Sequence, residues 1–121
     1  MILRVVLVMG EMRMSDEVFF YLETVGRRSG QPHEVELWFV PHGGCFYMVA
    51  EGREQAHWVQ NLLQQSSVRF RVGQAALFQP GRARTINPTG NPELAATVAA
   101  LFEAKYNWSD GLIVEVCPAP Q

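Results

Sequence analysis

Two arginines and a serine lie between glycines in the run Gly26-Arg27-Arg28-Ser29-Gly30 of this 121-residue chain. Guanidinium groups form bidentate, charge-assisted hydrogen bonds to phosphate oxygens. Glycines let the backbone turn successive N–H groups towards one point, which creates an anion-binding concavity. The same residue types are common at exposed hairpin tips. This segment, which we call the arginine turn, is therefore either a phosphate site or a solvated loop.

A second polar cluster, Glu51-Gly52-Arg53-Glu54, follows an apolar run that we expect to be a strand. A ligand can approach the backbone closely where a strand ends in glycine. Arg53 would add to the arginine turn if the fold brings the two together. Otherwise the cluster is a connecting loop whose charges pair with one another.

Aromatic residues at three places could line a ligand pocket. Trp58 lies on an apolar helical stripe, where packing in the core and stacking on a cofactor are both possible. Trp38 shares the polar side of a predicted strand with two glutamates. It therefore faces outward and needs a partner surface, either a ring system or another subunit. Tyr106, Asn107 and Trp108 close a predicted helix, where they would line a pocket mouth or cap the helix.

Several common kinds of site have no signature in the sequence. His33, His42 and His57 lack metal-ligand spacing, and we find no Ser/His/Asp or Cys/His arrangement. Neither a Walker loop nor a GxGxxG turn is present. Cys45 and Cys117 are far apart and indicate neither a disulfide framework nor a zinc site. We therefore expect no metal site, and a reducing cytoplasm fits.

The composition is that of one folded domain without a strongly charged surface. Hydrophobic residues make up 48% of the chain, charged residues make up 18%, and the formal net charge is −2. No global basic field exists to bind nucleic acid or an anionic membrane. Arginines alternate with apolar residues in 69–71 and 82–84, which indicates solvated strand faces, although an RNA-binding sheet has a similar pattern. The apolar run 2–9 is too short to span a bilayer and lacks an export cleavage site.

Turn signals divide the chain into short strands and two helices. Alternating or continuous apolar runs predict strands over 17–25, 33–40, 45–50, 67–72, 74–79, 82–86 and 112–117. Apolar stripes predict helices over 55–65 and 92–106. The second helix has Asn91 as its N-cap and Pro92 at its first position. Six or seven strands with two inserted helices favour an α+β barrel.

Three segments together resemble the deazaflavin-dependent nitroreductase family: Thr24-Val25-Gly26-Arg27-Arg28-Ser29-Gly30-Gln31-Pro32, Leu37-Trp38-Phe39-Val40 and His57-Trp58-Val59-Gln60-Asn61-Leu62. The resemblance implies one α+β, mainly β domain over 1–121, with an N-terminal segment at 1–16. Over 17–118 it implies a six-stranded antiparallel split β-barrel of the FMN-binding type with two helices. It also implies a homodimer, and a groove beside the barrel for coenzyme F-420, a deazaflavin.

By the same resemblance, the arginine turn would hold the phosphate and acidic tail of the cofactor. Trp38 would lie along the groove, and Trp58 and Asn61 would support its wall. The residues expected to bind the cofactor are Arg27, Arg28, Ser29, Gly30, Gln31, Trp38, Val49, Ala50, Gly52, Arg53, Trp58 and Asn61. Tyr106 would lie near the substrate as the candidate catalytic residue, where it or solvent would donate a proton.

The loop after the third predicted strand departs from the family pattern. Family members carry a serine and a basic residue in a longer glycine loop, where this chain has a compact segment over 49–54. The carboxylate of Glu51 is unfavourable beside a polyanionic cofactor unless Arg53 offsets it. This departure raises FMN, which the wider superfamily also uses, as an alternative cofactor.

The resemblance therefore implies a cytoplasmic oxidoreductase that passes hydride from C5 of reduced F-420 to a small, electron-poor acceptor. Quinones, nitro compounds and enones are acceptors of this kind. The alternatives are an FMN-dependent reductase on the same fold and a non-catalytic dimeric module that binds a cofactor or ligand. Neither nucleic acid nor a membrane is an expected partner. The cofactor supplies the difficult chemistry, so no strongly catalytic side chain is required.

Overall fold

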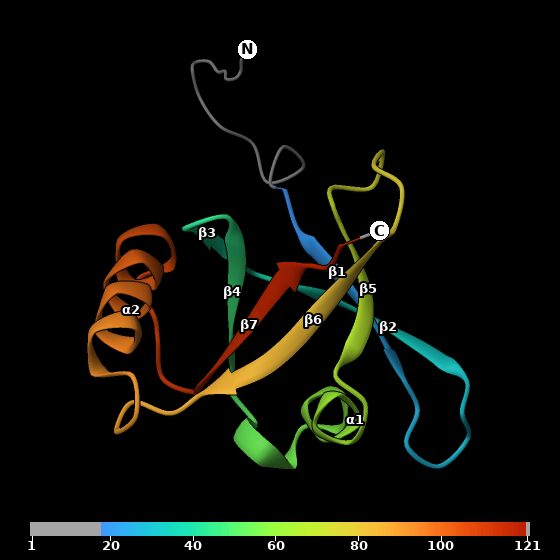
Figure 1. Cartoon of the computed structure of the whole chain (residues 1–121). Helices are drawn as coiled ribbons and strands as arrows, with labels where there is room; N and C mark the ends of the chain where they lie inside the picture. Colours follow the sequence, from blue (N-terminus) through green and yellow to red (C-terminus); the bar gives the residue numbers. More distant parts are fainter. Residues whose placement is uncertain (1–17, 121) are drawn as a thin grey trace.

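The computed structural model describes residues 18–120, so the predicted N-terminal segment 1–16 lies outside the described residues. Seven strands, two α-helices and one short 3-10 helix make up the described part (Figure 1). In chain order these are β1 (Phe20–Val25), β2 (Pro32–Leu37), β3 (Val40–His42), β4 (Cys45–Ala50), the 3-10 helix η2 (Arg53–Gln55), α1 (His57–Gln64), β5 (Ser67–Val72), β6 (Gln79–Ile86), α2 (Pro92–Tyr106) and β7 (Leu112–Pro118).

The seven strands form one antiparallel sheet in the order β2-β1-β5-β6-β7-β4-β3. The edge strands β2 and β3 follow one another with only Trp38 and Phe39 between them. The sheet therefore curls until its edges meet at this point, but no ladder joins β2 to β3 in the described sheet. The predicted α+β split barrel with two helices is confirmed. It has seven strands instead of six because the strand expected over 33–40 breaks at Trp38.

The barrel interior is filled by side chains that alternate along each strand. In β5, Val68 and Phe70 are fully or almost fully buried in the core, while Arg69 and Arg71 lie on the outer face. Gly81 of β6 passes under the Phe70 ring, since a Cβ there would come within 2.9 Å of it. Glycine at this position lets β6 approach the core closely.

Each helix covers a different part of the barrel. Helix α1 buries Val59 and Leu62 against the interior core. Helix α2 packs Val98 and Phe102 beside Ile113, on the outer face of the strands β3, β4 and β7. The range predicted for the second helix is confirmed. Within 18–120, no helix is long and apolar enough to cross a membrane.

Two local predictions are wrong. The segment 74–79 was predicted as a strand, but residues 74–78 form a loop and β6 begins at Gln79. Gly73, with a φ of 80°, turns the chain at the end of β5. Leu63, predicted on the apolar face of the first helix, is 54% exposed, whereas its neighbour Asn61 is buried. The predicted ranges of β4 and β5 are confirmed.

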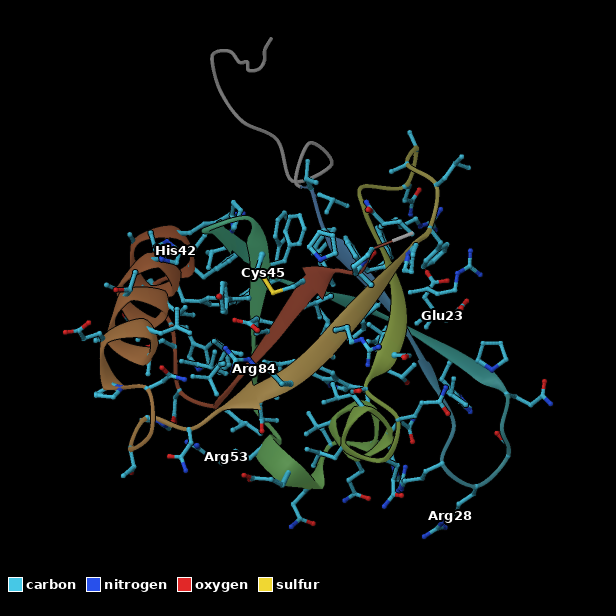
Figure 2. All side chains as sticks on the ribbon, viewed as in Figure 1. Glu23, Arg28, His42, Cys45, Arg53 and Arg84 are labelled. Carbon is cyan, nitrogen blue, oxygen red and sulfur yellow. A yellow bond between two sulfur atoms is a disulfide. The ribbon has the colours of Figure 1, made fainter. Side chains whose placement is uncertain are left out.

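A disulfide joins Cys45 to Cys117 on the neighbouring strands β4 and β7 (Figure 2). The pairing of Phe46 with Val116 places the two cysteines opposite each other, although they are 72 residues apart in the chain. The sequence-based expectation of no disulfide is wrong, because the pairing of β4 with β7 places two cysteines side by side that are distant in the sequence. Disulfides persist mainly in oxidising surroundings, so the reducing cytoplasm stays a prediction without support from this bond.

A buried charge network lies beside the disulfide. The Glu115 carboxylate accepts hydrogen bonds from the Tyr47 hydroxyl and from Arg84 Nε, both at 2.7 Å. Burial would raise the pKa of Glu115, but the hydrogen bonds from Arg84 and Tyr47 outweigh it and lower that pKa. Burial and the bond to Glu115 raise the pKa of Tyr47 to about 12. Glu115 and the two cysteines also form the one cluster of three possible metal ligands within 18–120, and the disulfide engages both sulfurs.

Candidate functional site

Two cavities in the described part of the chain share one wall, the side chain of Trp58. The first, which we call the aromatic pocket, has a volume of about 740 Å³. Its lining includes Trp38, Trp58, Trp108, Glu36 and the segment 49–52, which contains Glu51. The second, the arginine pocket, has a volume of about 490 Å³ and is lined chiefly by Arg27, Arg28, Ser29, His33, His57 and Asn61. The two cavities are therefore neighbours that meet at Trp58, and we refer to them together as the groove.

The arginine turn, which joins β1 to β2, is closed by its own backbone. The Gly26 N–H donates to the Gln31 carbonyl and the Gly30 N–H donates to the Gly26 carbonyl, both at 2.8 Å. Gly30 has a φ of 73°, a conformation that favours glycine. The Ser29 hydroxyl accepts a hydrogen bond from the Gln31 N–H at 3.1 Å. The turn therefore presents its arginines from a hydrogen-bonded frame.

Arg27 is anchored to helix α1. Its backbone N–H and its Nη1 donate to Asn61 Oδ1 at 3.2 and 2.9 Å, and its Nη2 lies 3.1 Å from His57 Nδ1. The Asn61 amide donates to the Thr24 hydroxyl at 3.2 Å. Asn61 and Thr24 are both buried, so their polar groups depend on this network. Arg27 is thereby fixed in the pocket wall, and its remaining N–H groups are available to an anion.

Arg28 is the exposed arginine of the turn. It forms no hydrogen bond or ion pair with any residue within 18–120. Figure 2 shows its side chain extending from the tip of the turn, away from the sheet. No described side chain competes for its guanidinium, so Arg28 can bind an anion that enters the arginine pocket. One fixed guanidinium and one exposed guanidinium therefore border the same cavity.

Trp38 forms a wall of the aromatic pocket and is held by its neighbours. Its ring stacks on Tyr106, with centroids 4.5 Å apart and an angle of 2° between the planes. Trp108 meets Trp38 edge-on at 6.4 Å. The Trp38 side chain nevertheless stays 43% exposed. One partner of this outward-facing residue is thus a ring of the same chain, and the rest of its surface is open to a ligand.

The hydroxyl of Tyr106 is engaged with the backbone. It donates to the Phe39 carbonyl at 3.0 Å and accepts from the Phe39 N–H at 3.1 Å. Tyr106 is absent from the lining of both pockets in the described chain. Donating a proton to a substrate would require breaking its bond to Phe39. The Tyr106 hydroxyl therefore fixes the backbone between β2 and β3, and its catalytic role stays a prediction.

Arg53 is not brought to the arginine turn. It donates to Asp110 at 2.7 Å, and it lines neither pocket. Figure 2 shows Arg53 and Arg28 well apart. The other residues of the segment 49–52 do reach the aromatic pocket. Glu51 therefore lines the cavity without an arginine partner from its own loop.

Two other predicted residues lie outside both pockets, and several lining residues, among them His57 and Glu36, were not predicted. Gly30 lines a shallow hollow beside the turn, and Gln31 serves the turn's backbone hydrogen bonds. His57 and Glu36 were not predicted to bind a ligand. His57 could have been found, since it lies four residues before Asn61 and therefore shares its helix face. Glu36 could also have been found, because it shares a strand face with the outward tryptophan.

Comparison with known proteins gives a consistent picture. A family model described as F420H2-dependent quinone reductase matches residues 5–112. The heme storage protein HutZ from Vibrio cholerae has a TM-score of 0.67 at 15% identity, covering 85% of this chain and 82% of that one. The structure of an F420 reductase has a TM-score of 0.56 at 18% sequence identity, covering 85% of this chain and 87% of that one. The structure of an F420-H2 dependent reductase has a TM-score of 0.54 at 22% sequence identity, covering 81% of this chain and 92% of that one. These structural likenesses show the fold alone. A search of curated protein sequences found no significant match.

Proposed function

The chain belongs to the F420H2-dependent quinone reductase family, and on this premise we propose that it is an oxidoreductase that reduces an electron-poor small molecule with coenzyme F-420. Quinones, nitro compounds and enones are acceptors of this kind. The observation that carries the proposal is the pair of joined pockets, one bordered by two arginines and the other by three indoles. The first suits an anionic tail and the second suits a planar ring.

The arginine pocket would hold the phosphate of the cofactor. Arg27 is fixed by Asn61 before any ligand arrives, so little side-chain entropy is lost when it binds. Arg28 would add a second guanidinium from the exposed side. Ser29 Oγ lines the same cavity and adds a hydroxyl donor.

The aromatic pocket would hold the ring and the acceptor. Its volume of about 740 Å³ lies in the upper part of the range of about 300–1,000 Å³ that is typical of ligand sites. When bound, F-420 would supply the hydride. The protein would orient the two rings between indoles and exclude water. Because the Tyr106 hydroxyl is bonded to Phe39, we assign to solvent the proton that completes the reduction of a neutral acceptor.

Cofactor titration tests the proposal directly. F-420 should bind in a fluorescence titration, and Arg28→Ala should weaken it about tenfold, since a charge-assisted hydrogen bond contributes about 1.5–3 kcal/mol. The matched control is Arg53→Ala, which removes an arginine outside both pockets and should leave the affinity unchanged. Binding of neither F-420 nor FMN would exclude both enzyme functions. Binding without turnover of any acceptor would leave the non-catalytic module.

FMN is the second candidate cofactor, because the Glu51 carboxylate lines the aromatic pocket and disfavours a polyanionic ligand. The same titration with FMN decides between the two. The single domain over 1–121, the homodimer and the cytoplasmic location stay predictions. Light scattering coupled to size exclusion tests the dimer, which should have about twice the 13.6 kDa mass of the chain.

A further inference from the structure

The lining of the aromatic pocket carries negative charge. Two carboxylates, Glu36 and Glu51, stand among three indoles in its lining. Among the described residues that line it, none is arginine, lysine or histidine. The arginine pocket, which also contains Trp58 in its lining, has two guanidinium groups, Arg27 and Arg28, against one carboxylate, Glu34. The groove is thus cationic at one end and anionic and aromatic at the other.

The nearby cations are engaged elsewhere. Arg53 is paired with Asp110 at 2.7 Å. Arg71 on the outer face of β5 lies 3.7 Å from Glu34 and over the Tyr21 ring. These contacts leave the carboxylates of the aromatic pocket without a salt bridge from either arginine.

The remaining nearby groups also leave the charge of the pocket in place. Lys105 donates to the neutral Phe39 carbonyl at 3.1 Å and so keeps its charge, but it does not line the pocket. The contact of Glu36 is with the Tyr21 hydroxyl at 2.8 Å, a neutral group that orients the carboxylate without cancelling its charge. The two carboxylates therefore keep their attraction for a ligand that carries positive charge.

Indole faces and carboxylates favour the same kind of ligand. The negative face of an indole attracts a cation within about 6 Å of the ring centroid. A carboxylate adds Coulomb attraction, which water moderates at the exposed residues Glu36 and Glu51. A neutral planar ring gains the stacking but not the charge terms. The lining therefore discriminates by charge among ligands of equal shape.

We propose that the aromatic pocket selects a planar aromatic cation, such as an N-alkylated quinolinium or acridinium ring. Resting on the proposed function, we further propose that such a cation is the electron acceptor. Trp38 and Trp58 would supply the π faces, and Glu36 and Glu51 the countercharge. Hydride reduction removes the positive charge, so the product loses its charge attraction to the pocket and dissociates more readily.

The reaction balances without a proton donor in the pocket. The cationic acceptor gains one hydride at a ring carbon, where a new C–H bond forms, and becomes a neutral dihydro ring. Bound reduced F-420 would supply the hydride and its two electrons, and the second hydrogen would pass to water as a proton. A neutral quinone instead keeps both hydrogens. Cationic substrates therefore need no acid, which agrees with the engagement of the Tyr106 hydroxyl by Phe39.

Binding without cofactor tests the charge selectivity. The probes are N-methylquinolinium and its uncharged isostere 1-methylnaphthalene, measured by equilibrium dialysis at low salt. We expect the cation to bind about tenfold more tightly, and Glu51→Gln and Glu36→Gln each to lower only the cation's affinity, by about fivefold. Glu54→Gln is the matched control, since Glu54 lies in the same loop outside the lining. Equal affinities for the two probes, or equal losses for both in the variants, would overturn the proposal.

Turnover tests the acceptor. With reduced F-420, Glu51→Gln should lower kcat/KM for 10-methylacridinium about fivefold. The kcat/KM for menadione, a neutral quinone, should stay unchanged. A pH indicator in weak buffer should record one more proton released per turnover with the cation than with the quinone. An unchanged ratio of the two kcat/KM values would overturn the acceptor assignment. Failure of F-420 to bind would refute the proposed function separately, because the dialysis experiment contains no coenzyme.

Discussion

The arginine pocket and the aromatic pocket share Trp58 but are held together in opposite ways. The arginine pocket takes four consecutive lining residues, 26–29, from one turn and fixes Arg27 through the buried amide of Asn61. The aromatic pocket takes its indoles from three separate segments and holds Trp38 by stacking on Tyr106. Directional hydrogen bonds therefore position the anchoring end of the groove, and ring packing shapes the end that meets the acceptor.

The hydrogen-bonded end should be the more sensitive to a single substitution. Asn61→Leu keeps the branching and the number of heavy atoms of the side chain but leaves the Thr24 hydroxyl and the Arg27 donors without their partner. We expect the free energy of unfolding to fall by about 3 kcal/mol, because buried polar groups lose their hydrogen bonds. Urea denaturation measures this loss. Gln60→Ala, an exposed neighbour that bonds the Glu54 carbonyl, is the control, and a similar effect in both would contradict the comparison.

The shared wall should couple the two pockets. Trp58→Leu removes the flat ring that both cavities use, and we expect F-420 affinity to fall about tenfold, in keeping with the energy of an aromatic stacking contact. Trp38→Leu alters the aromatic pocket alone. It should weaken the quinolinium probe while leaving the binding of inorganic pyrophosphate at the arginine pocket unchanged. Loss of pyrophosphate binding in Trp38→Leu would show that the pockets are not separable.

The stacked end should tolerate loss of its one hydroxyl. Tyr106→Phe preserves the ring on Trp38 and removes the two bonds to Phe39. The free energy of unfolding should fall by about 1 kcal/mol, and the shape of the pH profile of kcat should not change. A lost ionisation in that profile would restore Tyr106 as a proton donor.

A region outside both pockets supplies the smallest expected effect. The pKa of Glu115 is lowered from 4.5 in the folded protein, so its stabilising contribution is fully present above about pH 4.5. It is lost as the pH falls further, through the lower pKa of the folded state. Because the partner Arg84 is 58% exposed, solvent screening limits this contribution to about 1 kcal/mol or less. Urea titrations of Glu115→Gln from pH 3 to 7 should show a shallower acid limb than the wild type, with cofactor affinity at pH 7 unchanged.

Sequence reasoning predicted the arginine turn because its chemistry is contiguous. Glycine, arginine and serine within one turn carry the anion-binding signal before any folding is considered. The split barrel followed from a resemblance spread over three segments, and the periodic strands 45–50 and 67–72 were found at their observed boundaries. Local patterns of this kind need no knowledge of register.

The aromatic pocket could be predicted only in part and the disulfide not at all, because both depend on register between distant segments. Trp38 and Trp58 were placed beside the groove, but nothing in the chain spacing said that Glu36 would line the same cavity as Glu51. The sequence left open whether Arg53 offsets Glu51, and the pairing of Arg53 with Asp110, 57 residues away in the chain, was not predicted.

The bond between Cys45 and Cys117 also has a consequence for proteolysis. It encloses both helices and the strands β5 and β6 in one covalent loop. A protease that cuts once inside this loop, for example in the turn 87–91, leaves two fragments that remain linked. Such nicked protein should migrate as one species on a non-reducing gel and as two after reduction. A clipped chain can thus keep its barrel strands together until a thiol reductant releases them.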